Sequence, residues 1–298
     1  MSCAVHLALP PNVARSVRSR IAERFPDARV GAPDIHQEMY EFAAKCGASP
    51  FAGFAVSAYP QLVRNVLRDR PSFAVPEVDA PELRPELRAL GLTPPAPELR
   101  IVAVAPCVLA VNERWAATVS DWGHLVGRDF SDSLGTPPRD TPLPFLAEEL
   151  LAGFDAPPVR LDTASTPLDI NRRVSSGELG AGLLIPAFGR TFRGGRARMV
   201  WPDSGALAVP LVACIGREAP RRAHDILEYL LSREVQAFLS SCGGVVPVRQ
   251  DVPGFAELEE SGWKMRWPGW DALLRAAEVM DGAMGAAPGA GRCSCCNA

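Results

Sequence analysis

Short apolar runs alternate with amphipathic segments along most of the chain. Apolar runs of strand length occupy residues 4–9, 51–57, 101–112, 159–161, 181–185, 199–201 and 208–215, with a weaker candidate strand at 128–131. The run at 101–112 is nearly continuous, which is typical of a strand buried on both faces.

Between these runs, apolar residues recur at the spacing of an amphipathic helix. In the segment 12–25, the positions that share one face are Val13, Val17, Ile21 and Phe25. A capping-box pattern at 34–37 predicts a helix that continues to about residue 46. Further helices are expected at 61–67, 86–89, 143–151, 168–175, 219–231, 234–240 and 270–280, and a short one begins at 118–122. Strands that alternate with helices indicate an α/β fold with mainly parallel sheets, whose ligands bind beyond the carboxyl ends of the strands.

Composition narrows the class of protein. The 298 residues suffice for two domains or one large one, and an apolar share of 47% supplies a core. A net charge of −3 without any basic block gives no reason to expect nucleic acid as a partner. No stretch of about 20 apolar residues occurs, so neither a transmembrane helix nor membrane insertion is expected. Nucleophile-elbow, P-loop and zinc-protease motifs do not occur in the sequence, so no catalytic residues are predicted.

The first ten residues bear on the compartment. They lack a basic start, and their apolar part is short and is stopped by Pro10 and Pro11. A secretory signal has a basic region followed by about 7–15 apolar residues. The chain as it stands is therefore expected in the cytoplasm, whereas a true start further upstream would make the protein periplasmic.

The chain has eight cysteines, too few in a chain of this length for a disulfide scaffold. Cys107 and Cys214 lie inside apolar runs and are expected to be buried. The last three, Cys293, Cys295 and Cys296, follow a Gly/Ala/Pro linker and form a compact group of soft ligands. Such thiols suit a soft metal ion or part of an iron–sulfur cluster, with Cys3 or Cys242 as a fourth ligand. The alternative is that these thiols are incidental and that the protein carries no cofactor.

Several segments in the second half follow one another in a distinctive order. They are an apolar strand ending at Asn112, Ser-Asp-Trp-Gly-His-Leu-Val at 120–126, Ser-Gly-Glu-Leu-Gly-Ala-Gly-Leu-Leu-Ile-Pro at 176–186, Trp-Pro-Asp-Ser-Gly-Ala at 201–206, Ser-Arg-Glu-Val-Gln-Ala-Phe-Leu at 232–239 and Val-Pro-Val-Arg at 246–249. In this order they resemble the type II periplasmic binding protein family, the substrate-binding proteins of ABC transporters, and most closely its ferric-iron, thiamine and polyamine branch. The resemblance covers most of residues 4–253.

This resemblance implies a two-lobe α/β fold with mixed, mainly parallel sheets and a ligand cleft between the lobes. The strand that ends at Asn112 would cross from lobe 1 to lobe 2, and the chain would return near 204–210. Hinge closure would trap the ligand. The implied division is lobe 1 at 1–112 and 206–281, lobe 2 at 113–205, and a flexible Gly/Ala/Cys-rich tail at 282–298.

Four loops are expected to face this cleft, at residues 10–12, 57–59, 135–141 and 186–190. Three of them place free backbone N–H groups at the start of a helix, where an anion is stabilised. The candidate ligand-binding residues in these loops are Asn12, Ser57, Tyr59, Asp140, Thr141, Phe188 and Arg190.

Several candidates have an alternative role. Ser57, Asp140 and Thr141 would serve equally well as helix caps. The Asp140 carboxylate would oppose a bare anion and would favour a cation, or a ligand with a hydroxyl or an amine. The arginines of the fourth loop would either bind a phosphate or a carboxylate or lie on a solvated surface. They are Arg190, Arg193, Arg196 and Arg198.

Tyrosine content bears on iron. Ferric-binding members of the resembled family use tyrosine phenolates, typically paired in lobe 2. The tyrosines here are Tyr40, Tyr59 and Tyr229, and none lies at 186–202, which argues against a ferric phenolate site. The four histidines are scattered without metal-ligand spacing and are expected to be structural.

The leading hypothesis is a non-catalytic solute-binding protein that traps a small molecule or an ion between two lobes. If exported, its partner would be an ABC transporter permease. One alternative is a cytoplasmic metal-handling or ligand-sensing protein that uses the C-terminal cysteines. A second is an enzyme on the same fold, because one precursor-synthesising enzyme of thiamine metabolism shares it.

Overall fold

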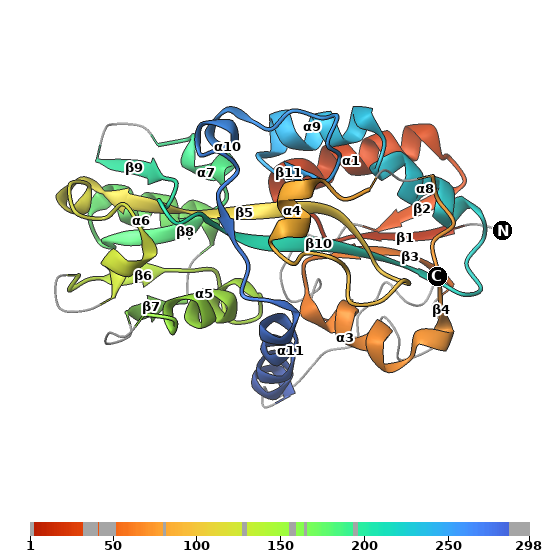
Figure 1. The fold of residues 1–298 in the computed structure, drawn as a ribbon, viewed down its shortest axis with the longest axis horizontal. Helices are drawn as coiled ribbons and strands as arrows, with labels where there is room; N and C mark the ends of the chain where they lie inside the picture. Colours follow the sequence, from red (N-terminus) through yellow and green to blue (C-terminus); the bar gives the residue numbers. More distant parts are fainter. Residues whose placement is uncertain are drawn as a thin grey trace.

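The computed structural model describes residues 3–31, 41, 52–79, 82–126, 130–154, 159–163, 166–192 and 196–285. Two lobes lie side by side, and two long strands run between them (Figure 1). The helix expected at 34–46, with His36 and Cys46, lies outside the described residues.

The first lobe is built on a sheet with the strand order β2-β1-β3-β10-β5. The strands are β1 (Cys3–Leu7), β2 (Ala28–Gly31), β3 (Gly53–Ser57), β5 (Arg100–Asn112) and β10 (Ala206–Gly216). β1 pairs in parallel with β2 and β3, whereas β10 pairs antiparallel with β3 and β5. Three short strands extend this sheet, and they are β4 (Phe73–Ala74) and β12 (Met265–Arg266) beside β10 and β11 (Val246–Pro247) beside β5.

The second lobe is built on the far half of β5. From residue 108 onward, β5 pairs antiparallel with β8 and β9, and β6 pairs in parallel with β7 and β8. The strands are β6 (Ser133–Gly135), β7 (Arg160–Asp162), β8 (Ala181–Leu184) and β9 (Ala197–Val200). One strand therefore belongs to both sheets and joins the two lobes.

Helices cover both sheets (Figure 1). Those of the first lobe are α1 (Pro11–Arg24), α3 (Pro60–Arg68), α4 (Pro85–Ala89), α8 (Arg222–Leu230) and α9 (Arg233–Gly243), with the single turn η1 (Arg70–Ser72). Those of the second lobe are α5 (Leu143–Leu151), α6 (Pro167–Ser176) and α7 (Pro186–Gly189), with η2 (Glu113–Trp115) and η3 (Trp122–Leu125). The chain ends with α10 (Ala256–Glu260) and α11 (Trp270–Gly285).

Burial explains the long apolar run of the sequence. Every residue of β5 after Arg100 is buried, and so is every residue of β10. Both strands are covered on two faces, as the continuous pattern predicts. One hydrophobic core lies in the first lobe, and a second extends from Leu62 of α3 through the crossing strands to Leu146 of α5.

Two of the segments that carry the family resemblance bind each other. Asp121 caps η3 by accepting from the Trp122 amide at 2.9 Å, and the same carboxylate accepts from the Ser204 hydroxyl at 2.6 Å. The buried Trp122 indole donates to the Gly205 carbonyl oxygen at 2.8 Å. The segment that leads into β10 is therefore fastened to the beginning of the chain's passage through the second lobe.

The candidate strand at 128–131 lies partly outside the described residues, and the next strand, β6, begins at Ser133. Two expectations need correction. The sheets are mixed but not mainly parallel, because β5 pairs antiparallel with β10, β8 and β9. The tail expected from residue 282 begins inside α11, which continues to Gly285. The lobe boundaries themselves stay a prediction.

Among the described residues, no helix combines the length and the apolar character needed to cross a lipid bilayer.

Two glycines offer a matched test of the packing. A methyl group on Gly182 of β8 would overlap Ile170 Cγ2 on α6, whereas one on Gly282 of α11 meets nothing within 4 Å. We expect Gly182→Ala to destabilise the protein by roughly 1–3 kcal/mol through overpacking. Gly282→Ala should stabilise it by roughly 0.5–1 kcal/mol, because alanine loses less backbone entropy in a helix. The midpoint of thermal unfolding measures both, and shifts of the same sign would contradict this packing.

Candidate functional site

A cavity of about 150 Å³ lies between the lobes, where the four predicted loops meet the crossing strands. Its walls come from the end of β1, the start of α3, the loop before α5, the start of α6 and the segment from β8 to α7. The lining residues are Ala8, Leu9, Pro10, Ala58, Tyr59, Ala105, Cys107, Pro137, Thr141, Pro142, Leu143, Pro167, Leu183, Leu184, Ile185, Phe188, Val209 and Leu211. Its position is that of a ligand cleft at the carboxyl ends of strands.

The crossing strands form the floor of the cleft. Ala105 and Cys107 of β5 lie opposite Val209 and Leu207 of β10 in the antiparallel ladder, and all but Leu207 line the cavity. Burial raises the pKa of the Cys107 thiol to about 12, so this side chain is a protonated, weakly polar group at neutral pH. The floor is therefore uncharged.

The loop before α3 contributes Tyr59. The buried Ser57 hydroxyl accepts from the Tyr59 amide at 3.0 Å and so holds the turn into α3, whose N-cap is Tyr59 itself. Tyr59 is 4% exposed. Burial, and to a lesser degree the nearby Asp140 carboxylate, raise the pKa of the phenol well above its usual value. Tyr59 therefore presents a neutral phenol and not a phenolate.

The loop before α5 contributes Thr141. Its hydroxyl donates to the Pro138 carbonyl oxygen at 2.8 Å and does not cap α5, whose N-cap is Pro142. The cap role offered as the alternative for Thr141 is therefore wrong, because the N-cap position falls at Pro142. Thr141 lines the cavity, whereas Asp140 does not.

Proline stands at the first or second position of each helix that begins beside the cleft, namely α1, α3, α5, α6 and α7. Proline has no backbone N–H, so each of these starts offers one donor fewer than a helix that begins with another residue. The anion-binding character that the sequence suggested for these loops is correspondingly weakened.

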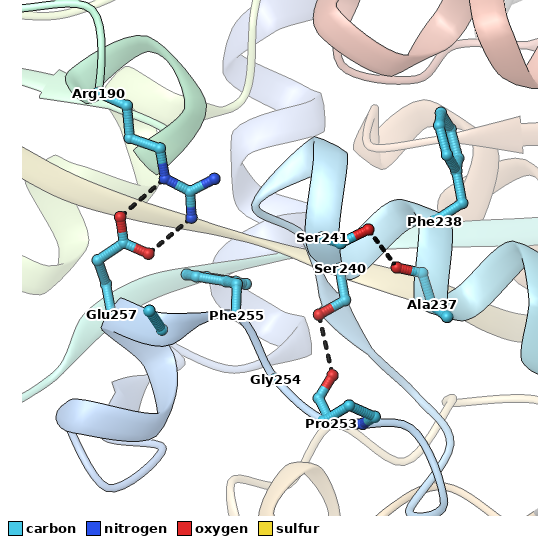
Figure 2. Close-up of a pocket in the computed structure, with 10 residues that line it drawn as sticks. Arg190, Ala237, Phe238, Ser240, Ser241, Pro253, Gly254, Phe255 and Glu257 are labelled. Atoms are coloured by element: carbon cyan, nitrogen blue, oxygen red, sulfur yellow. Dashed lines mark hydrogen bonds and ion pairs between the residues drawn. The ribbon is translucent and has the colours of Figure 1, made fainter.

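Two candidates lie away from the cavity and bind other parts of the protein. The Asn12 amide donates to the Gly243 carbonyl oxygen at 3.1 Å and ties α1 to the end of α9. Arg190 donates from Nε and Nη2 to the Glu257 carboxylate at 2.7 and 2.6 Å. This ion pair borders a separate, open groove of about 580 Å³ beside Phe238 and Phe255 (Figure 2).

The structure thus brings Tyr59, Thr141 and Phe188 together in the cleft and places Asn12, Ser57, Asp140 and Arg190 outside its lining. Their roles toward a ligand stay predictions. Sequence reasoning missed the floor residues, because buried positions of a crossing strand look like ordinary core. The alternation of Ala105 with Cys107 was the available signal, since residues two apart face the same side.

Within the described ranges, no group of three or more His, Cys, Asp or Glu side chains is placed to hold a metal ion. Cys3 of β1 and Cys214 of β10 are buried, and Cys242 of α9 is exposed. Cys293, Cys295 and Cys296 lie outside the described residues, so the cofactor prediction for them stays open.

Solved structures share this fold. A ferric binding protein from Campylobacter jejuni superimposes with a TM-score of 0.69 at 12% identity, over 94% of this chain and 97% of that chain. The iron-bound HitA from Pseudomonas aeruginosa gives 0.66 at 15% identity, over 96% and 99%. The substrate binding protein of an ABC transporter from Agrobacterium tumefaciens gives 0.59 at 16% identity, over 95% of each chain. At these identities the likeness establishes the two-lobe fold.

Sequence comparison identifies the family. The curated proteins include no match. A family model described as bacterial extracellular solute-binding protein matches residues 66–275, about seven tenths of the 298 residues. That match confirms the leading hypothesis of a solute-binding protein. The family's extracellular character favours the exported alternative over the cytoplasmic one. With its two lobes and the cleft between them, the chain belongs to the bacterial extracellular solute-binding proteins and has the type II periplasmic binding protein fold.

Proposed function

We propose that the protein captures a small organic solute with a mainly apolar body in the cleft between its lobes. It then delivers the solute to an ABC transporter permease on the outer side of the cytoplasmic membrane. The observation that supports this ligand class is the lining of the cleft, which consists mainly of aliphatic, aromatic and proline side chains. The permease as partner rests on the family and on its structural neighbours, one of which is named as the substrate binding protein of an ABC transporter.

Size and shape support a compact ligand. The cavity of about 150 Å³ matches the scale of an apolar cavity that holds benzene, about 150 Å³. Phe188 and Tyr59 offer ring surfaces on opposite lobes, and the floor offers Val209 and Leu211. A ring or a branched aliphatic group would bury most of its surface here, which is the main source of affinity in such pockets.

Tyr59 and Thr141 are the lining residues that carry a hydroxyl group. The Thr141 hydroxyl donates to the Pro138 carbonyl oxygen, and a hydroxyl oxygen can also accept. A ligand hydroxyl or amide N–H would find an acceptor there. A bare ion would lose its hydration without a charged partner in this lining, which is costly.

Ferric ion is the second candidate, because two of the structural neighbours described above are named as iron-binding proteins. The neutral Tyr59 phenol is a poor ferric ligand compared with a phenolate, which ranks this candidate below an organic solute. An enzymatic role and a metal role for the C-terminal cysteines remain alternatives that the cleft neither requires nor uses.

The proposal is tested by filling the cleft. Ala58 is half-buried and lines the cavity, so an indole at this position would occupy the space of the ligand. The probes are a panel of small aromatic and branched aliphatic alcohols, ketones and amides, with ferric citrate alongside. We expect at least one apolar compound to raise the midpoint of thermal unfolding of the unaltered protein. Ala58→Trp should weaken that compound's binding by at least about 100-fold, as measured by calorimetry.

The matched control is Ala89→Trp, which places the same side chain on the exposed end of α4 and should leave binding unchanged. Stabilisation by ferric citrate alone would overturn the proposed ligand class. Undiminished binding of the apolar compound by Ala58→Trp would place its site outside this cleft.

Cys107 supplies an independent check of the environment of the floor. Because burial raises its pKa to about 12, its thiolate fraction should rise about tenfold per pH unit up to pH 10. Its alkylation rate, followed by peptide mass spectrometry in folded protein, should rise with the same slope. A rate that levels off near pH 9 would indicate an ordinary thiol with a pKa of about 8.5 and a wetter cleft than the structure has.

A further inference from the structure

We propose that the C-terminal segment 254–281 acts as a clamp between the lobes. It contacts the second lobe through two ion pairs, Arg190–Glu257 and Glu149–Arg275, and through a hydrogen bond from the Trp201 indole to the Lys264 carbonyl oxygen at 2.9 Å. These pairs lie at opposite edges of the crossing strands and set how readily the lobes open. This goes beyond solute capture and does not depend on which solute binds.

The clamp is fastened to the first lobe. β12, between α10 and α11, pairs with β10, and the Ser240 hydroxyl of α9 donates to the Pro253 carbonyl oxygen at 3.0 Å. The Arg84 guanidinium lies 3.3 Å from the centre of the Trp263 ring. At the far end, Asp281 of α11 binds Arg64 and Gln61 of α3. The segment therefore moves with the first lobe.

One end of the clamp reaches α7 of the second lobe. Arg190 makes two parallel hydrogen bonds to Glu257 of α10, at 2.7 and 2.6 Å, and lies over the Phe255 ring (Figure 2). Their side chains are only 35% and 24% exposed, so water screens the pair incompletely. Consistent with a strong contact, the Arg190 guanidinium holds the pKa of Glu257 below its usual value.

The other end reaches α5, also in the second lobe. Arg275 of α11 donates to the Glu149 carboxylate at 3.1 and 2.9 Å. Beside this pair, the buried Leu273 of α11 belongs to the same hydrophobic core as Leu146 and Leu150 of α5. α7 and α5 lie at opposite edges of the crossing strands, with α10 and α11 beside them (Figure 1).

This arrangement couples the ion pairs to lobe motion. A rotation of the second lobe about the crossing strands changes the separation of α7 from α10, of α5 from α11, or of both. The two ion pairs, one at each edge, therefore stabilise the relative position of the two lobes in this structure. Partly exposed ion pairs each favour the paired state by about two- to fivefold, and high salt removes most of this preference.

Small-angle scattering of the full chain without added solute tests the clamp. We expect the radius of gyration of the unaltered protein to increase between 50 mM and 1 M NaCl. The double variant Glu257→Gln with Glu149→Gln should have the larger, high-salt value already at 50 mM. The reversal Arg190→Glu with Glu257→Arg should restore the smaller value that Arg190→Glu alone loses.

The matched control is Glu234→Gln. Glu234 forms an ion pair with Arg20 at 2.8 Å that is likewise partly exposed, but both residues belong to the first lobe. This variant should leave the radius of gyration unchanged, and circular dichroism confirms that each variant is folded. A radius that is insensitive to salt and to the double variant would overturn the clamp, as would an equal effect of Glu234→Gln.

Discussion

The architecture depends on the antiparallel pairing of β5 with β10. Their ladder runs from the Leu207–Cys107 pair to the Ala213–Arg100 pair, and nearly every residue in both strands is buried. The remaining parallel strands of each lobe attach to this pair, on one side through β3 and on the other through β8. Because backbone groups left unpaired in such a core would be costly, this pairing is the permanent connection between the lobes.

Cleft chemistry follows from that constraint. Strands that must be buried on both faces carry apolar side chains, so the cleft inherits an apolar floor at Ala105, Val209 and Leu211. Polar character has to come from the loops at the rim. There, proline occupies the helix starts, and the Ser57 and Thr141 hydroxyls form hydrogen bonds within their own loops. Both features favour the uncharged, mainly apolar solute proposed above.

Charged residues are kept at the hinge edges. Arg190, Glu257, Arg275 and Glu149 lie outside the cleft lining, where partial exposure lets them pair without the full cost of burial. The lobes are therefore joined in two physically different ways. Continuous strands supply a permanent connection, and ion pairs of the C-terminal segment supply a connection that can open.

The sequence by itself determined the element types, the crossing strand, the family and the loops that meet at the cleft. The spacing of apolar residues predicted the elements, and the order of several motifs along the chain predicted the family. Two of these motifs, Ser120–Asp121–Trp122 and Ser204–Gly205, bind each other in the fold. It could not determine where side chains of those loops point. Arg190 belongs to a cleft loop but pairs with Glu257, 67 residues away in the sequence, and Asn12 binds Gly243 across 231 residues. Only tertiary structure decided these partners, because contacts between distant segments depend on how the lobes pack and leave no local pattern.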